Sequence, residues 1–234
     1  MKILAVDTTA KAASVCLAQE EKIIGSFFID TALTHSRTLM PMIEALFSNT
    51  ETKPEELNAI AVNAGPGSFT GVRIGVAAVK GLAFAHSIPC VSVSTLESMA
   101  YNCLGGDCVV CAVMDARCSQ VYNAIFRVKG DKIERLCDDR ALSIEELDEE
   151  LSSMDKPIYL VGDGYSITEK GFKKTKISFV PERMRVQSAY SVACCALIKY
   201  NSGNTLTDSE LVPIYLRPSQ AERERNERLG IKNN

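Results

Sequence analysis

The sequence predicts an α/β protein with two tandem domains of one kind, each built from a mixed β-sheet flanked by helices. Three observations predict this fold class. A unit of three short strands joined by tight turns occurs twice, helical patterns with apolar faces follow each unit, and the two units begin about half a chain apart. Repetition over such a distance indicates that one supersecondary arrangement has been duplicated.

The two units match in their strands, their turns and the residues that end their first strands. In the first unit we expect strands over residues 3–6, 13–18 and 23–29. In the second we expect them over residues 110–114, 120–128 and 132–136. The leading strands end at Asp7-Thr8-Thr9 and at Asp115-Ala116-Arg117, and Asp115 lies 108 positions after Asp7. We therefore place one domain at residues 1–104, completed by the C-terminal segment from about 203 to 234, and the other at residues 105–202.

Helix signals fill the spaces between the strands. Thr34 is the expected N-cap of a helix over 35–47 with Pro41 inside it, and Ser143 with Glu146 has the spacing of a capping box. Apolar runs and periodicity give the remaining elements. These are strands over 57–63 and 158–161, helices over 72–86, 144–151 and from Ser188 to about Tyr200, and an exposed helix of alternating charge over 221–229.

Composition excludes several classes of protein. The net charge is −3, with 26 basic against 29 acidic side chains, which argues against a stand-alone nucleic-acid binder. We interpret the basic cluster from Lys170 to Lys176 as a solvated face rather than an RNA contact, although the sequence leaves both open. No apolar run approaches the roughly 18 residues of a membrane span, and Asp7 comes too early for a signal peptide. We expect a cytoplasmic protein with no membrane contact.

The cysteines favour a packing role. Nine is a high and odd number, and nothing indicates secretion, so reduced thiols are expected. Cys108 and Cys111 have the spacing of a metal-binding pair but lie in an apolar run that is typical of a strand. Residues three apart on a strand point to opposite faces, so these two thiols cannot share one ion.

The glycine-rich segment from Gly65 to Gly71 is the most informative local feature. It stands between an expected strand and an expected helix, where outward-facing backbone N–H groups can hold an anion. Val72-Arg73 replaces the Lys-[Ser/Thr] pair of a phosphate-binding P-loop, and the spacing does not fit a dinucleotide site. The alternative is structural, with Gly65 and Gly67 permitting a tight turn and Gly71 allowing close helix packing. The sequence leaves these two interpretations open.

Neither histidine indicates catalysis or a metal site. Leu39 stands four residues after His35, where a His-x-x-x-His metal site would need its second ligand, and His86 falls at a helix end. We predict no catalytic residue, no metal and no cofactor. The acids that end the two leading strands, with a glycine-flanked acid later in the chain, predict at most a vestigial nucleotide cleft. Its residues would be Asp7, Thr8, Asp115, Gly162, Asp163 and Gly164.

The helix over 72–86 is apolar on nearly every side, which is unusual for a domain of this size. We predict that one of its faces, together with one of the helix over 35–47, is covered by another subunit. Packing against the second domain is the alternative. The predicted interface residues are Leu39, Met42, Ile43, Leu46, Arg73, Gly75, Ala78, Val79 and Leu82.

Taken together, these motifs resemble those of the TsaB family, also called YeaZ, in order from Asp7 to Arg217. The most specific stretch is the run from Gly65 to Gly75. The others are Asp7-Thr8-Thr9, His35-Ser36-Arg37, Asp115-Ala116-Arg117 with Val121-Tyr122, Gly162-Asp163-Gly164 and Tyr215-Leu216-Arg217. The resemblance implies the actin, Hsp70 and sugar-kinase fold, which is ribonuclease H-like (ASKHA), in both domains.

The resemblance also implies a function. Members of this family are non-catalytic relatives of TsaD, which transfers threonylcarbamoyl to N6 of adenosine 37 in tRNAs reading codons that begin with A. We expect a scaffold subunit of that t6A complex that activates a TsaD-like catalytic subunit, is joined by a TsaE-like ATPase, and meets tRNA only indirectly. Alone, it is expected to form a homodimer through the same two helices. The alternatives are a stand-alone ASKHA-type kinase or ATPase and a metallopeptidase.

Overall fold

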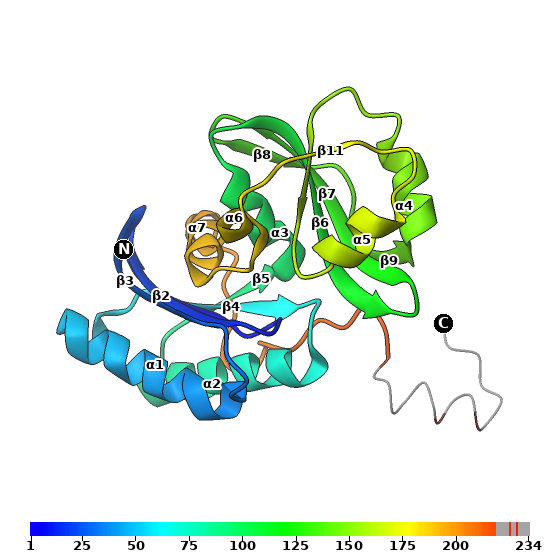
Figure 1. Cartoon of the computed structure of the whole chain (residues 1–234). Coiled ribbons are helices and arrows are strands. Elements are labelled where there is room, and N and C mark those ends of the chain that lie inside the picture. Colours follow the sequence, from blue (N-terminus) through cyan, green and yellow to red (C-terminus); the bar gives the residue numbers. More distant parts are fainter. Residues whose placement is uncertain (219–224, 226–227, 229–234) are drawn as a thin grey trace.

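A computed structural model describes residues 1–218, 225 and 228 of the chain. Its first sheet has five strands in the order β3-β2-β1-β4-β5. The first three strands form an antiparallel meander, whereas β4 and β5 run parallel to β1 (Figure 1). The strands are β1 (Lys2–Asp7), β2 (Ala13–Gln19), β3 (Lys22–Ile29), β4 (Ala59–Gly65) and β5 (Cys90–Ser94).

The second sheet repeats this order and these directions. Its main path is β11-β10-β6-β7-β8, where β6, β7 and β8 form the meander and β10 and β11 run parallel to β6. A short additional strand, β9, pairs with β7. These strands are β6 (Asp107–Arg117), β7 (Gln120–Lys129), β8 (Lys132–Arg135), β9 (Arg140–Ser143), β10 (Ile158–Val161) and β11 (Ile177–Ser178). The predicted repeat and the predicted α/β fold class are confirmed.

Both faces of the first sheet are covered by helices. On one face lie α1 (His35–Thr50) and α2 (Phe69–His86), and on the other lies α7 (Ala189–Asn201). The predicted domain boundaries place the residues of α7 in the second domain, but in the structure this helix packs on the first sheet. The small side chains of α7 pack on β1, β2, β4 and β5, because these strands offer alanine, cysteine and valine on that face.

The second sheet is also covered on both faces. Leu96 and Met99 of α3 (Thr95–Ala100) pack on one face with Phe126, although the predicted boundaries place these residues in the first domain. Leu147 and Leu151 of α4 (Ile144–Leu151) pack on the other. The predicted capping box of α4 is confirmed, since Ser143 and Glu146 each bond the backbone of the other. The remaining helices are α5 (Tyr165–Gly171), α6 (Glu182–Arg185) and the 3-10 turns η1 (Pro54–Glu56) and η2 (Tyr101–Cys103).

Most of the cysteines pack in the core as predicted, but Cys118 is exposed and Cys137 and Cys194 are half-buried. All nine are free thiols, and six of them are buried. Cys108 packs in the cluster beneath α3, whereas Cys111 packs in the cluster beneath α4, on the opposite face of the second sheet. Burial of Cys111 raises the pKa of its thiol, which keeps it protonated and unreactive.

One predicted helix begins earlier than expected, and another lies outside the described residues. The helix α2 begins at Phe69 rather than Val72, because the Ser68 hydroxyl accepts a hydrogen bond from the Gly71 amide and so caps the helix earlier. The helix expected over 221–229 falls outside the described residues, apart from Arg225 and Arg228. Among the helices of the described part of the chain, none has the length and apolar character needed to cross a bilayer.

Candidate functional site

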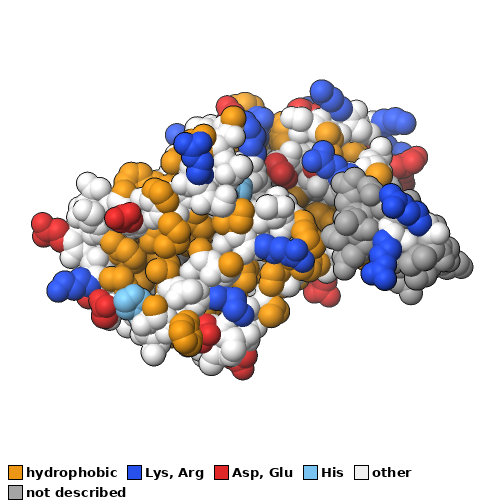
Figure 2. Space-filling view, turned by 90° about the horizontal axis from the view of Figure 1, so that it is seen from below, with side chains coloured by type: hydrophobic (Ala, Val, Ile, Leu, Met, Phe, Trp, Pro, Cys, Tyr) orange, Lys and Arg blue, Asp and Glu red, His pale blue; other side chains and the backbone are white. Residues whose placement is uncertain are grey.

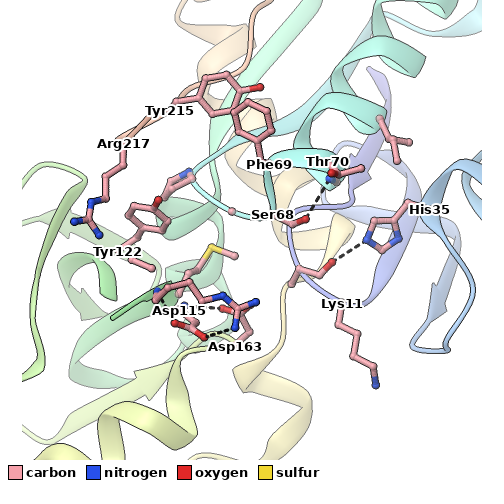
Figure 3. A pocket seen from close by; sticks show the side chains of 18 of the residues that line it. Lys11, His35, Ser68, Phe69, Thr70, Asp115, Tyr122, Asp163, Tyr215 and Arg217 are labelled. Carbon is pink, nitrogen blue, oxygen red and sulfur yellow. Dashed lines mark hydrogen bonds and ion pairs between the residues drawn. The ribbon is translucent and has the colours of Figure 1, made fainter. Parts of the chain in front are cut away.

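A cleft of about 890 Å³ opens where the carboxyl ends of β1 and β6 approach each other. One wall comes from the loop after β1 and the N-terminus of α2, and the other comes from the end of β6 and the loop after β10. Residues 214–218 of the C-terminal segment complete the rim. Figure 3 shows Asp115 and Asp163 on one side of the cleft and Ser68, Phe69 and Thr70 on another.

Asp7 lies beneath this cleft and is only 2% exposed. One carboxylate oxygen accepts hydrogen bonds from the Thr9 amide and the Thr9 hydroxyl, both at 2.8 Å. The other oxygen accepts one from the side-chain amide of Asn63, a buried residue of β4. Burial raises the pKa of Asp7, and these hydrogen bonds oppose the rise. The acid that ends β1 is therefore held by neighbouring protein groups on both of its oxygens.

The glycine-rich segment packs tightly against the loop after β1. The Thr8 hydroxyl donates to the Gly71 carbonyl at 2.7 Å, and the Ser68 amide donates to the Thr9 carbonyl at 2.7 Å. A Cβ atom on Gly71 would lie 2.0 Å from the Thr8 carbonyl oxygen, and one on Gly67 would lie 2.5 Å from that of Thr9. This contact supports the structural interpretation of these two glycines.

The second wall has the same character. Gly162 has a φ of 108°, and a Cβ atom there would lie 2.0 Å from the Val113 carbonyl oxygen. A Cβ atom on Gly164 would come within 3.1 to 3.2 Å of the Met114 backbone. Both glycines therefore bring the loop after β10 close to the end of β6, where Asp115 stands.

Asp163 is the most perturbed acid facing the cleft. Its side chain is open to the cleft, but the surrounding walls remove part of its hydration and raise its pKa to about 6. The negative charges of Asp115 and Asp7 add to this rise. Asp115 itself accepts a hydrogen bond from the Arg117 amide at 2.7 Å and lies 3.4 Å from the Arg117 guanidinium. Thus Asp115 and Asp163 line the cleft, whereas Asp7, Thr8, Gly162 and Gly164 are not among its lining residues.

Neither histidine stands in a catalytic arrangement. The Nε2 atom of His35 lies 2.8 Å from the Ala10 carbonyl oxygen, to which it donates, and His86 lies 3.0 Å from Glu55. Within the described residues, no three His, Cys, Asp or Glu side chains come together in a way that could hold a metal ion.

Most residues of the predicted partner interface lie inside the chain. Six of its nine residues are buried within the chain, because the large apolar side chains of α1 and α2 face the first sheet. The six are Leu39, Met42, Ile43, Leu46, Gly75 and Val79. Of the other three, Arg73 is exposed and Ala78 and Leu82 are half-buried. Helical periodicity identified the core face of these helices, not a free one.

The outward faces of α1 and α2 nevertheless carry apolar residues that the sequence analysis missed. Phe84 is 75% exposed and Met40 is 45% exposed, and Leu33, just before α1, is 47% exposed. Small residues Ala77, Gly81 and Ala85 lie beside Phe84 on α2 and are also exposed. Figure 2 looks directly onto this side of the molecule and shows hydrophobic side chains gathered over it. We call the exposed residues of this surface the helical face, which consists of Leu33, Met40, Ala77, Gly81, Phe84 and Ala85.

Comparisons with known proteins agree with this architecture. Residues 29–219 match a family model described as "TsaD: tRNA N6-adenosine threonylcarbamoyltransferase". The "tRNA threonylcarbamoyladenosine biosynthesis protein TsaB" of Bacillus subtilis is 34% identical over 71% of this chain and 73% of its own length. The protein of the same name from Escherichia coli is 30% identical over 94% and 96%. A solved structure of YeaZ from Pseudomonas aeruginosa superposes with a TM-score of 0.75 at 26% identity, covering 92% of this chain and 99% of that one. The chain belongs to the TsaB family, also called YeaZ.

Proposed function

We propose that this chain is a non-catalytic scaffold subunit in t6A biosynthesis. It would activate a TsaD-like protein that transfers threonylcarbamoyl to N6 of adenosine 37 in tRNAs reading codons that begin with A. The names of the Bacillus subtilis and Escherichia coli relatives support the pathway. The setting is cytoplasmic, and tRNA meets this chain only through the complex.

The state of the cleft supports a non-catalytic role. A nucleotide-hydrolysing protein with this fold would need the acid after its first strand to face the ligand. It would also need free backbone amides in the adjoining loop to bind the phosphates. Here both oxygens of Asp7 accept hydrogen bonds from Thr9 and Asn63, and the loop is closed against Gly67 and Gly71. The groups that would handle a phosphate are engaged within the fold.

The helical face is the observation that carries the proposal. Phe84 is an exposed phenylalanine on a helix of small residues, and Met40 is an exposed apolar residue of α1. Covering such apolar side chains with a partner is favourable, because it removes them from water. We propose that a TsaD-like subunit covers it, and that a second copy of this chain covers it when the partner is absent. A TsaE-like ATPase would join the assembled pair.

The experiment compares two exposed phenylalanines. Phe84→Asp charges the helical face, and Phe179→Asp changes a residue that is 80% exposed in the second half of the chain. Each variant is titrated with the TsaD-family protein of the same genome, and tRNA t6A is measured by mass spectrometry in a strain that depends on the chain. We expect Phe84→Asp to abolish both complex and modification, and Phe179→Asp to behave as wild type. Equal binding by Phe84→Asp would refute the proposed face.

A second candidate function rests on the cleft itself. Its volume, with Asp115 and Asp163 on one wall, is large enough for a small ligand and fits a stand-alone kinase or ATPase. Calorimetry of the isolated chain with Mg-ATP separates the two functions. Micromolar affinity with turnover in the absence of any partner would favour the enzyme, and we expect neither.

A further inference from the structure

The C-terminal segment lies along α2 and carries apolar side chains into water next to the helical face. We call residues 206–218 the C-terminal strap. We propose that the strap is a third element of the partner surface, so that the TsaD-like subunit contacts α1, α2 and the strap together. This inference rests on the proposed function and extends its surface toward the cleft.

The strap is fixed at its beginning. Leu206 exchanges two backbone hydrogen bonds with Cys90 of β5, each at 2.8 Å, and so covers the free edge of the first sheet. Leu211 is fully buried in the core beneath α2. Lys80 of α2 donates to the carbonyl oxygens of Ser209 and Leu211 at 3.3 and 2.9 Å. The strap is thus joined to α2 by side-chain and core contacts.

The strap is fixed again beside the cleft. The Ile214 amide donates to the Ala64 carbonyl at 2.7 Å, at the end of β4. A Cβ atom on Gly65 would lie 2.2 Å from the Ile214 carbonyl oxygen, so the first glycine of the glycine-rich segment leaves room for the strap. Only glycine adopts the φ of 127° found there without strain.

A three-residue cluster joins the strap to the first turns of α2. The rings of Phe69 and Tyr215 stack with centroids 4.6 Å apart. The Arg73 guanidinium lies 3.8 Å above the Phe69 ring, and its Nε donates to the Tyr215 hydroxyl at 2.8 Å. Figure 3 shows Phe69 and Tyr215 side by side at the rim of the cleft. Arg73, an exposed residue of α2, therefore connects this helix directly to the strap.

Along this anchored stretch the strap holds three apolar side chains out of the core. Val212 is 58% exposed, Ile214 is 40% exposed and Tyr215 is 41% exposed. Because the backbone on both sides of Val212 is held by Lys80 and Ala64, folding cannot bury this side chain by moving it inward. The strap therefore presents a fixed apolar surface, which reduces the entropy lost when a partner binds.

Because the strap lies against α2, we assign to it the same partner as to the helical face. Stable interfaces bury about 800 Å² of accessible surface on each partner. The helical face alone has few large exposed side chains to contribute to such an area. The strap adds three more directly beside α2, through the Arg73 cluster. One partner lying across α2 would cover both surfaces, and the same TsaD-like subunit is therefore the occupant that we assign to the strap.

The experiment places one charge on each of two matched aliphatic positions. Val212→Asp charges the strap, whereas Ile198→Asp charges a position that is 55% exposed on α7, on the opposite side of the first sheet. Full-length variants are titrated with the TsaD-family protein of the same genome by calorimetry, with Phe84→Asp in parallel. Thermal unfolding of each variant alone verifies the fold, and Val212→Ser repeats the measurement without a charge.

We expect Val212→Asp to weaken binding at least tenfold, Val212→Ser to weaken it less, and Ile198→Asp to leave it unchanged. If Val212→Asp binds as wild type while Phe84→Asp does not, the strap lies outside the interface and the proposed function stands. If both bind as wild type, the helical face and the proposed function fail as well. Equal loss with Ile198→Asp and Val212→Asp would also overturn the assignment, because it would show a general effect of charge.

Discussion

The side-chain amide of Asn63 donates a hydrogen bond to the Asp7 carboxylate, and both residues are buried under the cleft. The same amide also donates to the Ser98 hydroxyl of α3 at 3.0 Å. Since α3 packs on the second sheet, Asn63 links an acid of the first sheet to a helix of the second. The Asn63 carbonyl oxygen has no protein partner among the described residues.

Asp7→Asn is therefore expected to be tolerated. Rotation of the Asn63 side chain would turn its unpaired oxygen toward the new amide, and the substitution removes a buried charge. We expect the free energy of unfolding to stay within about 1 kcal/mol of wild type or to rise. Asp7→Ala should lower it by about 2–3 kcal/mol, because the Thr9 and Asn63 donors lose their acceptor. Urea denaturation measures both, and loss of t6A in a well-folded Asp7→Asn variant would show that the carboxylate has a chemical role.

The raised pKa of Asp163 predicts a defined pH dependence. An aspartate in the unfolded chain titrates near pH 3.9, whereas Asp163 in the folded chain titrates at about 6. Between these values the folded state holds the proton and the unfolded state does not, so stability falls as the pH rises from about 4 to 6. Above about pH 6 Asp163 is ionised in both the folded and the unfolded state, and its effect on stability no longer changes with pH.

The corresponding measurement is the difference in Tm between wild type and Asp163→Asn. The variant should be more stable at pH 7.5, and the difference should shrink toward pH 4.5. Acids that do not interact with Asp163 titrate equally in both proteins and cancel in this comparison. A difference that does not vary with pH would contradict the assignment.

Gly71 and Gly81 of α2 give a matched pair of substitutions. Gly71→Ala places a Cβ atom 2.0 Å from the Thr8 carbonyl oxygen, and we expect a loss of about 3 kcal/mol. Gly81 has no neighbour within 4 Å of such an atom, so Gly81→Ala should stabilise the isolated chain by about 1 kcal/mol through helix propensity. Chemical denaturation of both variants tests the contact, and similar effects would mean that the loops are less closely packed.

Asp148 holds the loop between α5 and β11. Its carboxylate accepts the backbone amides of Lys173, Lys174 and Thr175 at 2.7 to 2.9 Å. Asp148→Ala leaves three donors without an acceptor and should lower the free energy of unfolding by about 2–3 kcal/mol. The neighbouring Glu149 makes an exposed ion pair with Lys174, and Glu149→Ala should have no measurable effect. Hydrogen exchange of the three amides, fast only in Asp148→Ala, checks the mechanism.

Local patterns predicted most of the elements but not the surfaces. Alternating apolar residues, Asp7 and Asp115 at matching ends, and the Ser143 capping box all act within a few residues, so the sequence alone indicates them. The free side of α2 could not be identified in this way, because periodicity does not say which apolar stripe meets the sheet. Phe84 was not among the predicted interface residues, although its position well away from the buried Val79 around the helix was a usable signal.

The roles of the glycine-rich segment and the strap depend on contacts that are distant in sequence. Gly65 meets Ile214, and Gly71 meets Thr8, so neither contact leaves a local pattern. The packing of α7 on the first sheet also depends on contacts that are distant in sequence. The alanines and Cys195 of α7 pack against small side chains of β1 and β2. These residues come together only when the sheet has formed, so the sequence carries no local sign of the contact.

The position of α7 and the strap has a consequence for synthesis of the chain on the ribosome. The first sheet is complete once β5 has emerged. In the described part of the chain, the helix that covers one of its faces ends at Asn201, and the residue that pairs with its β5 edge is Leu206. The N-terminal half therefore leaves the exit tunnel with apolar surface uncovered, and the last fifth of the chain must arrive before that half can close. Nascent chains stopped before α7 should accordingly bind chaperones, while release of the whole chain permits both halves to fold in one event.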